Sequence, residues 1–226
     1  MTKIIAHRGY SERLIDNSKT AFHEAVTKKF AMIELDIQLS KDNYIFIFHD
    51  TFIGRHRLEN LNFKEITELN STIFTLVEFF EIFSKKNIEI YLDIKGNSLS
   101  ICQELHDVLR SLENLKKIYI ASYNFQILEE LHHLSNQTQI EYQLGLITEN
   151  IYSFAMFQKM IELIDMKFIS FYWEILEHDI IHFFHQQKVI VFTYTCRNDS
   201  EYQFIKNYQV DGIVSNILIP EKMKKN

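Results

Sequence analysis

The stretch Ala31-Met32-Ile33-Glu34-Leu35-Asp36-Ile37 combines an apolar, strand-like run with two carboxylates that stand two positions apart. Side chains on a strand alternate between its two faces, so Glu34 and Asp36 project to the same side. The apolar residues between them project to the other side, where they can pack against helices. The stretch therefore predicts a buried strand whose polar face lines the mouth of a closed sheet.

The same pattern recurs in the run 88–95, where Asp93 and Lys95 share a face with Tyr91. Another short apolar run, Lys3-Ile4-Ile5-Ala6, lies near the start of the chain and is followed by a loop at His7. Reactive groups of α/β folds are commonly placed where a strand ends. These three runs predict that charged side chains converge at one end of a parallel sheet.

Strand-like and helix-like segments alternate along the whole chain. The expected strands are 4–7, 32–36, 88–95, 118–122, 141–147, 168–172, 189–195 and 212–216. The expected helices are 17–29, 63–70, 75–86, 99–111, 125–134, 153–163, 176–187 and 199–207. Eight strands that alternate with helices predict an α/β fold, a (β/α)8 TIM barrel, formed by one domain over residues 1–226.

One strand-like segment, 44–49, follows the second strand too soon for a crossover helix. It follows the polar turn 40–43, so we interpret it as the return arm of a β-hairpin at the barrel mouth. A turn centred between Lys41 and Asp42 pairs Glu34 with His49. The hairpin is therefore expected to bring His49 back to the carboxylates.

Composition restricts the class of protein. Hydrophobic residues make up 46% of the 226 residues, with one Pro and five Gly, which excludes a disordered or linker-rich chain. The formal net charge of −6 and the scattered lysines make nucleic acid an unexpected partner. Two distant cysteines, Cys102 and Cys196, indicate free thiols. With no signal-like or membrane-spanning run, we expect a cytoplasmic protein without a transmembrane segment. Its oligomeric state is left open.

Three carboxylates, Glu34, Asp36 and Asp93, are expected at the barrel mouth. Carboxylates that converge on a small volume repel one another, and a hard divalent cation is the usual means of neutralising them. The sequence therefore predicts a cation site with oxygen ligands, which suits Mg²⁺ or Ca²⁺. A rival interpretation, that these residues form the solvated face of an exposed strand, requires them to be exposed.

Together these residues resemble the glycerophosphodiester phosphodiesterase family, within the phospholipase-C-like phosphodiesterases. The resemblance rests on the order and spacing of His7-Arg8-Gly9, Glu34-x-Asp36, His49-Asp50, Asp93-Ile94-Lys95, Ser122-Tyr123-Asn124 and the segment 210–216. The resemblance covers essentially the whole chain. Asp93 stands where the family usually has Glu, and Asp16 and Tyr194 lie in motifs that also depart from the family pattern.

The resemblance implies a small-molecule phosphodiester as substrate and a metal-dependent hydrolysis of glycerophosphodiesters to glycerol 3-phosphate and an alcohol. In that scheme Glu34, Asp36 and Asp93 hold the cation, and Arg8 and Lys95 bind the substrate phosphate. His7 and His49 are the catalytic base and acid, because histidine can reach either protonation state near neutral pH.

Two other functions remain open from the sequence. One is a related phosphodiesterase that acts on a lysophospholipid or sphingolipid. The other is a catalytically weak barrel that binds phosphodiesters or a partner protein, which the departures at Asp16, Asp93 and Tyr194 would favour. His49 as a structural cap and Lys95 as a rim residue are the corresponding rival roles.

Overall fold

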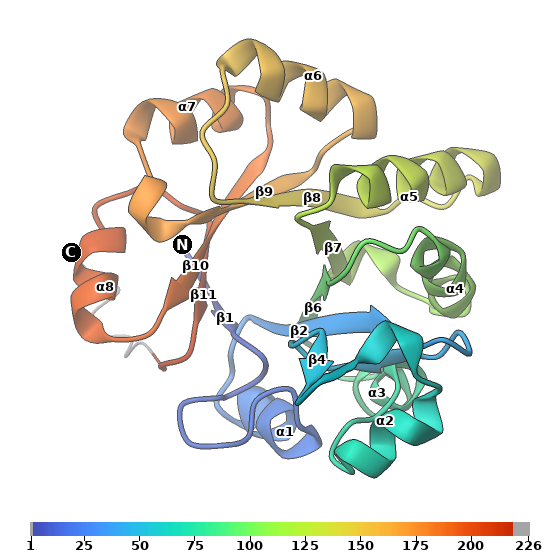
Figure 1. Ribbon diagram of the computed structural model, residues 1–226. Coiled ribbons are helices and arrows are strands. Elements are labelled where there is room, and N and C mark those ends of the chain that lie inside the picture. Colours follow the sequence, from blue (N-terminus) through green and yellow to red (C-terminus); the bar gives the residue numbers. More distant parts are fainter. Residues whose placement is uncertain (1, 219–226) are drawn as a thin grey trace.

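The computed structural model describes residues 2–218, which form a closed barrel of eight parallel strands surrounded by helices (Figure 1). The barrel strands are β1 (Lys3–Ala6), β2 (Met32–Leu39), β6 (Glu89–Ile94), β7 (Ile118–Ser122), β8 (Gln143–Thr148), β9 (Phe168–Tyr172), β10 (Ile190–Cys196) and β11 (Gly212–Ser215). Their order around the barrel is β1-β11-β10-β9-β8-β7-β6-β2, and pairing of β1 with β2 closes it. The expected (β/α)8 TIM barrel is confirmed.

Helices follow the strands, and all but the second, which packs in the insertion between β2 and β6, cover the outside of the barrel. They are α1 (Lys19–Thr27), α2 (Phe63–Leu69), α3 (Leu76–Phe83), α4 (Ser100–Leu109), α5 (Phe125–Thr138), α6 (Phe154–Ile164), α7 (His178–Gln186) and α8 (Asp199–Ile205). The expected elements are present, and the largest difference is the end of α5, expected at 134 and observed at Thr138. Helix ends are hard to place from sequence because propensity changes little from one residue to the next.

Large side chains fill the interior of the barrel beneath its mouth. Tyr91 lies edge-on to Phe168, with ring centroids 5.4 Å apart, and Phe168 lies 5.3 Å from Phe192. Gly145 on β8 makes room for this packing, because a Cβ atom there would lie 2.5 Å from the Phe168 ring. The interior is therefore a packed core rather than a channel, and only its C-terminal end is open to form a site.

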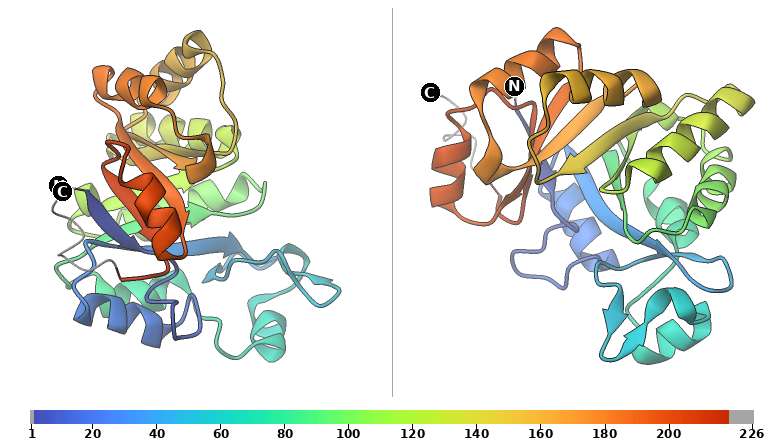
Figure 2. Two further views of the ribbon diagram at one scale, coloured as in Figure 1. Left: turned by 90° about the vertical axis from the view of Figure 1, so that its left-hand side faces the viewer. Right: turned by 45° about the horizontal axis from the view of Figure 1, so that its top comes forward.

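The segment between β2 and β6 projects from the barrel as a small insertion (Figure 2). It contains β3 (Ile45–Ile47), which pairs antiparallel with β2, and the short strands β4 (Phe52–Ile53) and β5 (His56–Arg57). The expected hairpin and the count of eight barrel strands are thus confirmed.

The expected register of this hairpin is wrong by one residue. Ile37 pairs with Ile47 and Leu39 with Ile45, and the ladder ends before His49, so Glu34 has no partner on the return arm. The reason is a three-residue loop closed by Asn43, whose φ of 65° is left-handed and whose N–H donates to the Ser40 carbonyl. Such a loop adds one residue compared with a tight two-residue turn.

None of the helices in the described part of the chain has the length and hydropathy needed to span a bilayer. Cys102 and Cys196 are both buried free thiols, as expected from their separation in the sequence.

Candidate active site

Three carboxylates meet at the C-terminal mouth of the barrel. Glu34 and Asp36 lie on β2 and Asp93 lies beside them on β6, where the register pairs Asp36 with Asp93. One oxygen from each carboxylate lies within 4.8 Å of the other two. Glu34, Asp36 and Asp93 are 4%, 1% and 7% exposed, which rules out the rival interpretation of a solvated strand face.

Two cationic side chains are packed against this cluster. Nζ of Lys95 lies 2.6 Å from Asp93 Oδ2 and 3.0 Å from Asp36 Oδ1. Nε of Arg8 lies 3.0 Å from Asp36 Oδ2, and its Nη1 lies 2.9 Å from Asp16 Oδ2. Lys95 is therefore part of the cluster and not a residue of the rim.

The loop after β1 wraps over Asp36. The Arg8 backbone N–H donates to Glu34 Oε2 over 2.8 Å, and Nδ2 of Asn17 donates to Asp36 Oδ2 over 2.7 Å. Gly9 allows this path, because its φ is 79° and a Cβ atom there would lie 2.7 Å from the Ala21 backbone. The loop thus fixes the orientation of both carboxylates. Asn17 was not predicted as a site residue, although it lies in one of the motifs that depart from the family pattern.

Burial and neighbouring charges shift the pKa values of the three carboxylates in different directions. Burial, together with Asp36 and Asp93, raises the pKa of Glu34 well above its usual value. Burial also raises the pKa of Asp93. For Asp36, burial is outweighed by Lys95 and Arg8, which hold its pKa below the usual value. Three carboxylates thus face two cations, and Glu34 is the member that lacks a compensating charge.

His7 stands at the end of β1, with Nδ1 hydrogen-bonded to Asn216 Oδ1. Because an amide oxygen only accepts, Nδ1 carries the proton and the lone pair is on Nε2. Burial, with a contribution from the nearby Arg8, lowers the pKa of His7 to about 4. The imidazole is therefore neutral near pH 7, the form in which it can accept a proton.

His49 reaches the same cavity from the insertion. Its Nδ1 lies 2.7 Å from Asp50 Oδ1, a contact that orients the ring. The segment is held to β2 by Gln38, whose Nε2 donates to the backbone carbonyls of Phe48 and Asp50 over 2.7 and 2.9 Å. Neither Asp50 nor Gln38 was predicted as a site residue. Gln38 anchors the segment even though the ladder stops short of His49.

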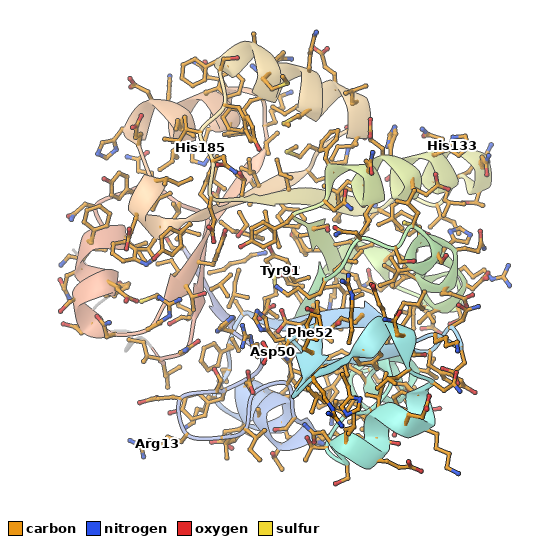
Figure 3. All side chains as sticks on the ribbon, viewed as in Figure 1. Arg13, Asp50, Phe52, Tyr91, His133 and His185 are labelled. Atoms are coloured by element: carbon orange, nitrogen blue, oxygen red, sulfur yellow. The ribbon has the colours of Figure 1, made fainter. Side chains whose placement is uncertain are left out.

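All seven predicted site residues line one cavity of about 260 Å³. They are His7, Arg8, Glu34, Asp36, His49, Asp93 and Lys95. The opposite wall includes Glu149, Tyr172 and Arg197, which are not among the seven predicted site residues. Figure 3 shows Tyr91 near the barrel centre, whereas His133 and His185 lie on outer helices. Among residues 2–218, the three carboxylates are the one group of acidic, His or Cys side chains placed to share a metal ion.

The carboxylates fit a divalent cation. Oxygens that share an ion at about 2.4 Å can be at most roughly 4.8 Å apart, and the three carboxylates meet this limit. Oδ1 of Asp93 is buried and has no hydrogen-bond partner among the described residues. A buried carboxylate oxygen without a donor is costly unless a cation satisfies it, so the cluster could hold a metal ion.

Comparison with known proteins agrees with this geometry. The chain is 33% identical over 155 residues to an uncharacterized protein of Mycoplasma genitalium, a match that covers 59% of this chain and 63% of that protein. It is 27% identical over 167 residues to a glycerophosphodiester phosphodiesterase of Caldanaerobacter subterraneus, covering 65% and 69% of the two chains.

The fold is shared with a phosphodiesterase of Oleispira antarctica, solved in complex with the product sn-glycerol-3-phosphate. The TM-score is 0.83 at 20% identity, with 99% of this chain and 96% of the other covered. The model of the glycerophosphoryl diester phosphodiesterase family matches residues 7–218. The chain therefore belongs to the glycerophosphoryl diester phosphodiesterase family, a family of phosphoric diester hydrolases.

Proposed function

We propose that this protein hydrolyses glycerophosphodiesters to glycerol 3-phosphate and an alcohol with the help of a divalent cation. The observation that carries the proposal is the meeting of three buried carboxylates, two cations and two imidazoles in one cavity. The product bound to the Oleispira enzyme supports glycerol 3-phosphate as the product here.

Glu34, Asp36 and Asp93 are the residues that would hold the cation. Their ligand atoms are all oxygens, which favours Mg²⁺ or Ca²⁺ over softer metals. When bound, the cation supplies a Lewis acid that polarises a phosphoryl oxygen of the substrate. The neutralising charge would also allow Glu34 to ionise despite its burial.

Arg8 and Lys95 would bind the phosphate and oppose the negative charge that develops on it. Both cations are already oriented by carboxylates, Arg8 by Asp16 and Asp36 and Lys95 by Asp36 and Asp93. Charges fixed before the reaction need no rearrangement as the transition state forms, which is the main source of electrostatic catalysis.

His7 would act as the general base. Its Nδ1–H is used by Asn216, so Nε2 is the atom that can take a proton from the attacking hydroxyl group. That hydroxyl belongs either to a water molecule, which gives glycerol 3-phosphate directly, or to the glycerol of the substrate, which gives a cyclic phosphate that a water molecule must then open. His49 would act as the general acid and protonate the leaving alcohol, and Asp50 orients its ring for that transfer.

Turnover of a panel of glycerophosphodiesters, followed by ³¹P NMR, tests this function. We expect release of glycerol 3-phosphate, loss of turnover in EDTA, and recovery on addition of Mg²⁺ or Ca²⁺. His49→Ala should be compared with His133→Ala, a histidine on the outside of α5. Full activity in EDTA after exhaustive dialysis would contradict the cation requirement. A cyclic phosphate as the only product would favour the related reaction on other phosphodiesters.

A further inference from the structure

One exposed part of the molecule is rich in large hydrophobic side chains. In the described part of the chain fifteen such side chains are exposed, and five of them lie within residues 151–163. They are Ile151, Tyr152, Phe154, Met156 and Leu163, and each is between 37% and 56% exposed. Single apolar residues are normal on a protein surface, whereas a group of them marks a site of contact.

Most of this group belongs to α6 (Phe154–Ile164), which lies on the outside of the barrel between α5 and α7 (Figure 1). Phe157 and Ile164 form the buried side of this helix. Met156 and Leu163 are seven residues, or about two turns, apart, so they lie in one row along a different side. Helix α6 therefore has two apolar sides, and only one of them is buried by the described residues.

Two charged residues, Lys159 and Glu162, flank this row, and both are exposed. Glu162 is oriented by Gln158, whose Nε2 donates to its Oε1 over 2.7 Å. Because Lys159 and Glu162 are the only charged residues of α6, the helix offers no excess of positive charge to an anionic lipid surface. The partner that this surface fits is therefore itself apolar, with a positive and a negative charge in matching places.

A second copy of α6 meets that requirement when the two helices run antiparallel. The midpoint between Met156 and Leu163 and the midpoint between Lys159 and Glu162 both fall next to Met160 in the sequence. A two-fold axis beside Met160 therefore places Met156 against Leu163 of the second copy, and Lys159 against Glu162 of the second copy. Each contact occurs twice, which is the self-complementarity that a two-fold interface requires.

The size of the surface sets the expected strength of this contact. A fully exposed side chain of this kind presents about 150–250 Å², so five that are half exposed offer at most roughly 400–600 Å² per copy. Two copies would thus bury about 800–1,200 Å², which is at the low end for a specific interface. We expect a reversible dimer with a dissociation constant of about 1–100 µM rather than an obligate one.

We propose that α6 and the preceding residues 151–153 form a homodimer interface, in which α6 packs antiparallel against α6 of a second copy. The inference is independent of the proposed function, because none of these residues lines the catalytic cavity.

Sedimentation equilibrium of the full chain measures the dimer directly. Leu163→Glu should raise the dissociation constant by at least about 30-fold, because the two-fold axis removes two leucine contacts at once. Val77→Glu is the matched control, since Val77 is 51% exposed but lies on α3, and it should leave the constant unchanged. A wild-type chain that stays monomeric at about 500 µM, or a dimer that Leu163→Glu leaves intact, would overturn the proposal.

Charge reversal tests the antiparallel register without removing apolar contacts. Lys159→Glu or Glu162→Lys alone places like charges against each other twice and should raise the dissociation constant by about 3- to 30-fold. The double variant restores opposite charges and should dimerise within about 3-fold of the wild type. Thermal unfolding of each variant checks that the fold is intact. A double variant that dimerises as weakly as either single variant would overturn the proposed interface.

Vesicles test the rival occupant, a lipid bilayer. Cosedimentation with vesicles of phosphatidylcholine, with and without phosphatidylglycerol, should recover the wild type and Leu163→Glu equally poorly. Strong vesicle binding by a monomeric wild-type chain, abolished in Leu163→Glu, would assign the surface to a bilayer and overturn the proposal.

Discussion

The two halves of the barrel mouth differ in the kind of polar residue that their strands present. The strands β1, β2 and β6 present His7, Glu34, Asp36 and Asp93, and all of these except His7 are formally charged. The strands β7, β8 and β9 end in the neutral polar residues Ser122, Thr148 and Tyr172, and the neutral Thr195 is the penultimate residue of β10. The fold gives the two halves equivalent positions, so the difference lies in the side chains alone.

The two halves also differ in how their polar groups are satisfied. Ser122 Oγ donates to the Ile94 carbonyl of β6 over 3.1 Å and Thr148 Oγ1 donates to the Asn150 carbonyl over 3.2 Å, so these hydroxyls bond to main-chain carbonyls. Asp36 instead interacts with Lys95, Arg8 and Asn17 from other segments. The comparison teaches that charged side chains with long-range partners are concentrated on one half, whereas the hydroxyl groups of the other half bond to main-chain carbonyls.

The largest expected effect is that of neutralising the charged half. Asp36→Asn or Glu34→Gln should lower kcat by more than roughly 10⁴-fold, because several kcal/mol of charge stabilisation in the transition state depend on the cation site. The isosteric amides should leave the fold intact, which circular dichroism and thermal unfolding can check. If either variant retained a tenth of wild-type turnover, the assignment of the reaction to the charged half would be wrong.

The histidines should come next. His7→Ala and His49→Ala should each lower kcat by about 10²- to 10⁴-fold with little change in thermal stability, the usual contribution of a general acid or base. A p-nitrophenyl ester needs no acid, so it should rescue His49→Ala but not His7→Ala. Small and equal losses on both substrates would favour a barrel that binds phosphodiesters without hydrolysing them.

A smaller effect is expected for Asn17, which orients Asp36. Asn17→Ala should weaken divalent-cation affinity by about 10- to 100-fold, as loss of a hydrogen-bond partner of a metal ligand typically does. Calorimetric titration of the cation measures this directly. Asn97→Ala, at an asparagine whose Oδ1 accepts a hydrogen bond from Asn124, is the control and should leave affinity unchanged.

Asp93→Glu tests how closely Asp93 of the charged half approaches the cation. If Asp93 reaches the cation only through a water molecule or a strained side chain, the longer carboxylate should tighten cation binding and can raise turnover by a few-fold, about 1 kcal/mol or less. Calorimetry again gives the answer. Weaker binding in Asp93→Glu would mean that the pocket is already adapted to the shorter side chain.

The smallest expected effect lies in the neutral half. Thr148→Val removes a hydroxyl that bonds the backbone of residue 150, so unfolding should become easier by about 1 kcal/mol while kcat changes less than about 3-fold. Chemical denaturation and steady-state kinetics measure the two quantities. A 100-fold loss of kcat here would show that both halves take part in the reaction.

The sequence by itself determined the strands and which residues face the barrel mouth. The alternation in 31–37 and 88–95 has the period of a strand, so the shared face of Glu34 and Asp36, and of Asp93 and Lys95, follows from local geometry. The roles of these residues stay predictions until the variants are measured. Their convergence follows because parallel strands end at the same side of a closed sheet.

Tertiary structure alone decided the contacts between loops. The register of the hairpin depends on the left-handed backbone of Asn43. The hydrogen bond from Asn17 to Asp36 depends on the path of the loop that contains Asn17. The hydrogen bond between the hydroxyl groups of Tyr123 and Tyr194 joins residues 71 positions apart. Such contacts carry no periodic signal, because barrel closure and backbone dihedral angles bring together side chains whose spacing in the chain is arbitrary.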